Sequence, residues 1–381
     1  MNRSTVEYIE MNHNTVFLNI LKSSLWGTAS AVPQEFDEWA KVFALAKAQS
    51  VLGLVANAVL SDEEVARRIP ADMQKRLKAF VMSSVGMTTR LNQVLLRCID
   101  ILREAGIEPV LLKGQGLAQY YPKPSCRQSG DIDLYVVPED FDKAVQVLLT
   151  LSDKPDSPHQ TRKHIEIKIG NVIIELHRIC ATHPLPRYDS LLQTYTSEGL
   201  VNDYSAVNIG GLSIRTPSNT FNAFYVFYHL WRHFLTEGVG LRQLCDLMML
   251  LHSRKDYIDV SCLEEMLVSL NLMKPWKVFG CVLVDSLGMP SSEYPFYDNS
   301  YSVPARKVLN RILIEGNFGH ERSYYKSRKK SYIWMKLHAF GCHLSRYFCV
   351  ALIFPSHAIS QFWYIASTGL KAVFSDLFIK K

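Results

Sequence analysis

The period of the hydrophobic residues changes twice along this chain of 381 residues, and these changes limit the fold more than any other feature. Up to residue 106, apolar residues recur at steps of three and four, the spacing of amphipathic helices. The clearest examples are "FDEWAKVFALAKAQSVLGLVANAVL" (36–60) and "ADMQKRLKAFVMSSVGMTTRLNQVLLRCIDILRE" (71–104). Gly106 follows the second run, at a position where glycine often ends a helix. The sequence therefore predicts an N-terminal helical region over 1–106.

After residue 106 the apolar runs become short, as in β-strands. They are "IEPVLLK" (107–113), "DIDLYVV" (131–137), "HIEIKI" (164–169) and "VIIELH" (172–177), with a predicted helix, "EDFDKAVQVLLTL" (139–151), after the second. Gly170 and Asn171 separate the last two runs and predict a hairpin. From about residue 216 the helical period returns. We therefore predict an α+β fold, with a small mixed sheet in a core over 107–215 and a helical C-terminal domain over 216–381.

Composition excludes several classes of protein. Hydrophobic residues make up 48% of the chain and charged residues 20%, which is untypical of a disordered protein. The net charge of +6 is compatible with a polyanionic ligand but does not select one. The eight cysteines show neither CxxC nor paired zinc spacing, so we expect reduced thiols. The N-terminus lacks the pattern of a signal peptide, which makes a cytoplasmic protein the expectation.

One C-terminal segment is long enough to cross a membrane. Residues 347–370, "YFCVALIFPSHAISQFWYIASTGL", contain no Asp, Glu, Lys or Arg. Their middle is the polar stretch "PSHAISQ", so we expect a packed pair of short helices rather than integral insertion, with a peripheral membrane helix as the alternative. The basic run within 322–336 is typical of a solvated face, and binding of acceptor RNA or an anionic surface is its alternative.

The run at 131–137 carries two carboxylates inside an apolar strand. Alternate side chains of a strand share a face, so Asp131 and Asp133 point to one side, and Glu175 and His177 likewise share a face of their own strand. If the two strands lie together, three carboxylates meet. Like charges raise one another's pKa unless cations neutralise them. Mg²⁺ prefers oxygen ligands, and a pair of such ions can assist an in-line phosphoryl displacement.

Upstream, Lys113 and Gly114 stand where an apolar strand passes into a helical segment. A glycine at such a turn allows backbone N–H groups to approach phosphates. Lys113 can contact phosphate as a point charge, and Arg127 can do so with two parallel hydrogen bonds. Each element alone is commonly structural, but their order along about 65 residues indicates a nucleoside triphosphate site.

Residues 110–136, "VLLKGQGLAQYYPKPSCRQSGDIDLYV", resemble the bacterial family of uncharacterised nucleotidyltransferases in the DNA polymerase β-like superfamily. The resemblance implies a polymerase β-like core that moves a nucleoside monophosphate from an NTP to an acceptor and releases pyrophosphate. It implies Mg²⁺, or Mn²⁺ instead, at Asp131, Asp133 and Glu175. On the nucleotide side it implies Lys113, Gly114 and Arg127, together with their neighbours Gln115, Ser129 and Gly130, and it places His177 beside Glu175.

The acceptor stays open, because a small molecule, an RNA or a protein can each supply a nucleophilic oxygen. Two alternatives remain for the activity as a whole. One is a catalytically silent nucleotide-binding protein. The other is a toxin-like nucleotidyltransferase that acts on RNA or protein.

Two further pairs are four residues apart in predicted helices. His229 and His233 share a helix face, where they either line the substrate cleft, pack in the core or bind zinc. Arg242 and Asp246 either form an ion pair within one helix or leave Arg242 to point at the nucleotide or acceptor.

Overall fold

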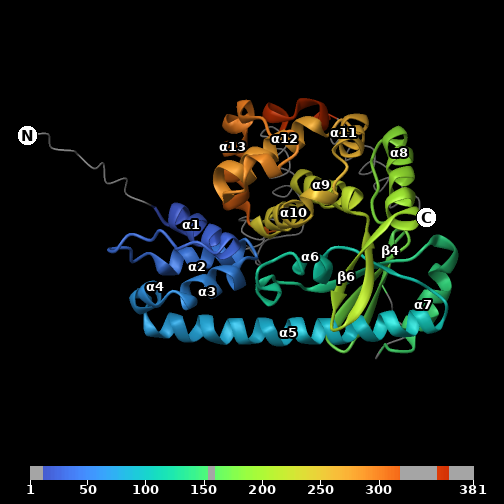
Figure 1. The fold of residues 1–381 in the computed structure, drawn as a ribbon, viewed down its shortest axis with the longest axis horizontal. Coiled ribbons are helices and arrows are strands. Elements are labelled where there is room, and N and C mark those ends of the chain that lie inside the picture. Colours follow the sequence, from blue (N-terminus) through green and yellow to red (C-terminus); the bar gives the residue numbers. More distant parts are fainter. Residues whose placement is uncertain (1–11, 153–158, 318–349, 360–381) are drawn as a thin grey trace, which may run out of the picture.

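The computed structural model describes residues 12–152, 159–317 and 350–359, with N-terminal helices on one side of a central sheet and C-terminal helices above it (Figure 1). The N-terminal helices are α1 (His13–Trp26), α2 (Trp39–Ala48), α3 (Leu52–Ser61), α4 (Glu63–Arg68) and α5 (Ala71–Glu104). The 34-residue helix α5 runs along one edge of the molecule, from α4 to the sheet (Figure 1). It ends as predicted, because Gly106 adopts φ +77° and the N–H of Ile107 donates to the carbonyl of Leu102.

The central sheet has five strands in the order β1-β2-β5-β4-β3. The strands are β1 (Val110–Leu111), β2 (Asp131–Tyr135), β3 (His159–Gln160), β4 (His164–Ile169) and β5 (Val172–His177). β2 and β5 are parallel, and the other neighbouring pairs are antiparallel. The predicted hairpin is confirmed, since β4 and β5 are joined at Gly170 and Asn171.

Short helical elements lie between these strands and after β5. They are α6 (Gly114–Ala118), η1 (Pro124–Cys126), η2 (Pro138–Asp140), α7 (Phe141–Leu149), α8 (Pro186–Ser197) and η3 (Glu198–Asn202). A second, two-stranded sheet follows, formed by β6 (Tyr204–Ile209) and β7 (Leu212–Pro217), and it was not predicted. Its turn is made by Gly210 and Gly211, both at positive φ. The predicted α+β fold is confirmed, whereas the domain boundaries at 106 and 215 stay predictions.

The C-terminal helices are α9 (Asn219–Leu235), α10 (Leu241–Arg254), η4 (Lys255–Tyr257), α11 (Val260–Ser269), α12 (Met273–Cys281), η5 (Val282–Ser286), η6 (Ser291–Glu293), η7 (Asn299–Tyr301) and α13 (Ser302–Glu315). Figure 1 shows α9 and α10 between the sheet and the outer helices. Both are buried on most of their surface, which fits the apolar residues around their circumference. Together α9 and α10 form the upper wall of the site described below.

Within the part of the chain that the structure describes, no single helix is long and apolar enough to cross a membrane. One pair of helices, α11 with the segment Met273–Ser286, has the length and composition of a membrane span, but the two are bent by 117°. Of the segment 347–370, only 350–359 is described. There 350–353 and 355–359 are helical on either side of Phe354, whose ring packs edge-on against Trp231 at 4.8 Å. The basic run within 322–336 lies outside the described residues.

Candidate active site

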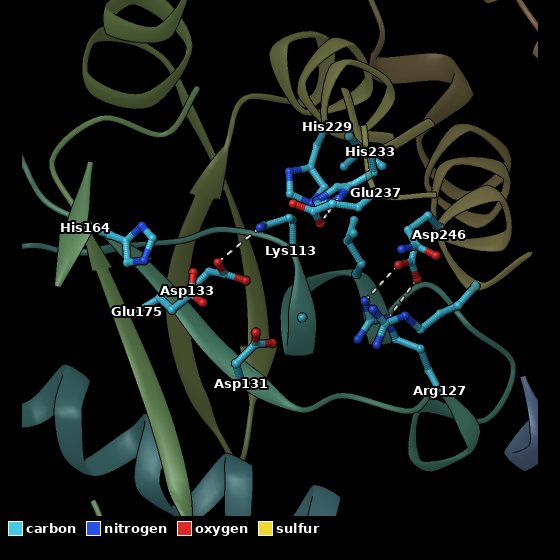
Figure 2. A pocket seen from close by; sticks show the side chains of 15 residues that line it. Lys113, Arg127, Asp131, Asp133, His164, Glu175, His229, His233, Glu237 and Asp246 are labelled. Carbon is cyan, nitrogen blue, oxygen red and sulfur yellow. Dashed lines mark hydrogen bonds and ion pairs between the residues drawn. The ribbon is translucent and has the colours of Figure 1, made fainter. Parts of the chain in front are cut away.

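The two carboxylates of β2 and the one of β5 lie on the same face of the sheet. The parallel register places Asp133 beside Glu175, with Asp131 two residues earlier on the same face. Ile132 and Leu134 point to the opposite face and are fully buried, which fixes the strand in this orientation. Figure 2 shows the three carboxylates gathered at one wall of a pocket. The sequence thus placed all three acids correctly relative to one another, although it did not specify a parallel pair.

The turn from β1 to α6 brings Lys113 to these carboxylates. Its ammonium nitrogen lies 3.1 Å from Oδ1 of Asp133 (Figure 2). Gly114 follows at φ +47°, a conformation that favours glycine, and a Cβ there would lie 3.6 Å from the carbonyl oxygen of Asp131. The backbone conformation, rather than lack of space, therefore favours glycine at this turn, since a contact of 3.6 Å is an ordinary van der Waals contact.

His177, at the end of β5, is the second partner of Asp133. Its Nε2 lies 3.0 Å from Oδ1 of Asp133 and 3.3 Å from Oε2 of Glu175. Burial alone would raise the pKa of Asp133, but Lys113 and His177 outweigh it and hold that pKa below its usual value. Burial likewise disfavours a charged His177, yet its hydrogen bonds to Asp133 and Glu175 raise its pKa. Asp133 is thus an ionised carboxylate held by the ammonium group of Lys113 and the imidazole of His177.

Asp131 has a different environment. Burial, followed by the charge of Asp133, raises the pKa of Asp131. Among the described residues, its carboxylate makes no hydrogen bond or ion pair, although it lines the cavity. A divalent cation at this face would offset both causes of the raised pKa. The donor set therefore fits a hard cation held by carboxylate oxygens.

Arg127 is held by Asp246 of α10, a residue far from it in the sequence. Its Nε and Nη2 donate to Oδ1 and Oδ2 of Asp246 on α10, each at 2.8 Å, and the hydroxyl of Tyr121 donates to Oδ1 at 2.7 Å. Its Nη1 lies 2.5 Å from Oγ of Ser129. Arg127 and Asp246 are both buried. This bidentate pair joins the loop before β2 to the C-terminal helices, and the sequence did not predict it.

Arg242 lies one turn before Asp246 on α10. Two arrangements were predicted for Arg242. The ion pair with Asp246 is not formed, because Asp246 accepts hydrogen bonds from Arg127 instead. Nη1 of Arg242 donates to the carbonyl of Gln128 at 2.9 Å, and the residue lines the cavity. Arg242 is therefore placed where an anion in the cavity can reach it.

The wall opposite the carboxylates comes from α9 and the loop after it (Figure 2). The rings of His229 and His233 lie 4.4 Å apart, and Nδ1 of His233 lies 3.1 Å from Oε2 of Glu237. Burial, with a smaller contribution from Lys113, lowers the pKa of His229 well below its usual value, so this ring is neutral. His164 on β4 also lines the cavity and was not predicted. Its signal was the alternation in "HIEIKI", which puts it on one face of the strand with Glu166, and the register of β4 and β5 then pairs it with His177.

The cavity has a volume of about 380 Å³, within the range of small-molecule sites. Eight of the predicted site residues line it: Lys113, Gly114, Arg127, Asp131, Asp133, Glu175, His229 and Arg242. The other four predicted residues, Gln115, Ser129, Gly130 and His177, are not among those that line this cavity. The amide of Gln115 is buried without a hydrogen-bond partner among the described residues.

Comparisons with known proteins were made by family, by curated sequence and by structure. Residues 36–283 match the model of a family described as "Uncharacterised nucleotidyltransferase". No curated protein matches the chain. Among solved structures, the chain is similar to the crystal structure of an antigenic nucleotidyltransferase-like protein from Paracoccidioides brasiliensis, with 14% identity, 56% of this chain and 95% of that chain covered, and a TM-score of 0.31. Because the family match spans more than half of the 381 residues and includes the carboxylates, the chain belongs to the family of uncharacterised nucleotidyltransferases.

Proposed function

We propose that the protein is a divalent-cation-dependent nucleotidyltransferase, which moves a nucleoside monophosphate from an NTP to a hydroxyl group of an acceptor. The acceptor oxygen forms a bond to the α-phosphorus, the bond from the α-phosphorus to the bridging oxygen breaks, and pyrophosphate leaves with that electron pair. Membership of the family supports nucleotidyl transfer in general terms. The observation that carries the proposal is the β2–β5 register, which puts Asp131, Asp133 and Glu175 on one face beside Lys113.

The three carboxylates would hold Mg²⁺, or Mn²⁺ in its place. When bound, such a cation neutralises charge on the triphosphate and polarises the phosphoryl group. Asp131 supports this assignment, since its carboxylate has no partner among the described residues and its pKa is raised. Glu175 is more exposed than Asp133, and we assign it to accept the proton of the acceptor hydroxyl.

Cationic groups on two sides of the cavity would bind the phosphates. Lys113 and the Gly114 turn approach from β1, and Arg242 approaches from α10. Arg127 is already engaged by both oxygens of Asp246, so we assign it to hold the loop before β2 in position. His177 would orient Asp133 in the same way, through its 3.0 Å contact.

Nucleotide transfer can be measured directly with NTPs labelled at the α-phosphate, in Mg²⁺, with small metabolites, RNA and protein as separate acceptor pools. We expect label in one pool, and a rate lower by more than about 100-fold in Asp131→Asn and Asp133→Asn, because ligands of the cation matter more than the residues that support them. Glu139→Gln is the matched control, since Glu139 is an exposed carboxylate just after β2 and outside the cavity.

Two results would count against this proposal. Equal transfer by the wild type and both aspartate variants would place the chemistry elsewhere. Tight NTP binding without transfer to any pool would favour a catalytically silent nucleotide-binding protein. Label in RNA or protein would instead identify the toxin-like class of acceptor.

A further inference from the structure

A second group of side chains with metal-binding chemistry lies on the β4–β5 hairpin. The antiparallel register pairs His164 with His177 and Glu166 with Glu175. Residues two apart in a strand share a face, so two imidazoles and two carboxylates form a square on one side of the hairpin. His164 and Glu175 line the cavity, which makes this the side that faces the proposed active site.

Three members of this square are already close together. One ligand atom each from His164, Glu175 and His177 lies within 4.8 Å of the other two. Nε2 of His177 lies 3.3 Å from Oε2 of Glu175, about the separation of neighbouring ligands around an ion with bonds of about 2.1 Å. The rings of His164 and His177 have centroids 5.0 Å apart. A small rotation of the His164 side chain would therefore complete a three-ligand set.

We infer that His164, Glu175 and His177 bind a first-row transition-metal dication such as Zn²⁺, with Nε2 of a neutral His177 exchanging its hydrogen bond to Asp133 for the ion. Two imidazoles and one carboxylate suit such ions, whereas Mg²⁺ is held mainly by oxygen atoms. The side chains of His164 and Glu175 are 20% and 24% exposed, so an ion can reach them from the cavity. This site shares Glu175 with the proposed active site, but it does not depend on nucleotidyl transfer.

A neighbouring residue orients the new ligand. Oγ1 of Thr161 lies 3.4 Å from Nδ1 of His164, and the same hydroxyl accepts from the backbone N–H of His164 at 3.1 Å. A partner at the second ring nitrogen is the usual feature of a metal-binding histidine, because it fixes the ring and its tautomer. This contact directs Nε2 of His164 as the ligand atom.

The inference is tested by calorimetric titration of Zn²⁺ into the full-length protein in excess Mg²⁺. We expect one equivalent to bind, and His164→Gln to weaken binding by more than about tenfold. Asp131→Asn removes a carboxylate of the proposed Mg²⁺ site but no member of this cluster, so it should bind Zn²⁺ like the wild type. His13→Gln, on α1, is the control for loss of a histidine elsewhere.

Unchanged Zn²⁺ affinity in His164→Gln would overturn the inference, as would an equal loss in Asp131→Asn. If circular dichroism shows that His164→Gln is unfolded, X-ray absorption at the zinc edge of the wild-type protein replaces the titration of this variant. We expect two imidazole ligands in that spectrum, and fewer than two would refute the site. Absence of nucleotidyl transfer, with Zn²⁺ bound as expected, would defeat the proposed function alone.

Discussion

Burial and the neighbouring charge of Asp133 raise the pKa of Asp131, so the ionised carboxylate that we propose as a metal ligand is unfavourable for stability without a cation. In the unfolded chain the carboxyl titrates near its usual pKa of about 3.9. Its ionisation therefore costs little folding free energy below pH 4, and the full cost is reached once the pH exceeds the raised pKa of the folded state.

We expect Asp131→Asn to raise the melting temperature of the metal-free protein by a few degrees at neutral pH, with the difference disappearing below about pH 4. Thermal unfolding in the presence of a chelator, followed across that pH range, measures the effect. Glu139→Gln should show no such gain. A lower melting temperature for Asp131→Asn at neutral pH would mean that the carboxylate has a stabilising partner. The gain would illustrate the usual exchange of stability for function at a binding site.

At the scale of elements, α3 packs directly on the segment that precedes Arg127. A Cβ at Gly53 would lie 2.4 Å from the carbonyl oxygen of Cys126, at the end of η1. We expect Gly53→Ala to lower the free energy of unfolding by about 1–3 kcal/mol, because backbone must move to relieve the overlap. Nucleotidyl transfer should fall with it, since the loop carrying Arg127 is displaced.

Gly86→Ala is the matched control for this change. Gly86 lies inside α5, and a Cβ there meets nothing within 4 Å. We expect it to raise the free energy of unfolding by about 1 kcal/mol through helix propensity, as measured by urea denaturation. Equal stability of the two variants would show that α3 and η1 are not in close contact.

At the scale of the whole molecule, the pair of Arg127 and Asp246 joins segments 119 residues apart. Breaking a buried pair on one side leaves an uncompensated charge, so Arg127→Met and Asp246→Leu should each lower the free energy of unfolding by about 3–5 kcal/mol. The double variant should lose less than the sum of the two. A double-mutant cycle by urea denaturation measures the difference, and additive losses would argue that the pair does not couple the core to α10.

The sequence predicted best what depends on local alternation. Asp131 and Asp133 share a face because they are two residues apart, and the β4–β5 hairpin formed where glycine and asparagine separate two apolar runs. The same reasoning would have found β6 and β7, since "YSAVNIGGLSIRTP" alternates on both sides of a Gly-Gly turn. The sequence therefore contains a clear signal for that hairpin.

Contacts between distant segments were beyond such reasoning. The bond of Asp246 to Arg127 rather than to Arg242 depends on how α10 is docked, because a spacing of four along one helix does not reveal a stronger partner from another segment. The place of His164 opposite His177 required the register of two strands. The alternation alone gave its face but not its neighbour.

The lining of the cavity holds five carboxylates against three permanently cationic side chains, while the whole chain carries a net charge of +6. A bare triphosphate is strongly anionic, so the excess of carboxylates in the lining would oppose its binding. A nucleotide already complexed with a divalent cation meets no such barrier. If the proposed nucleotide site is correct, the charge of the lining favours arrival of the triphosphate together with its divalent cation over arrival of the bare triphosphate.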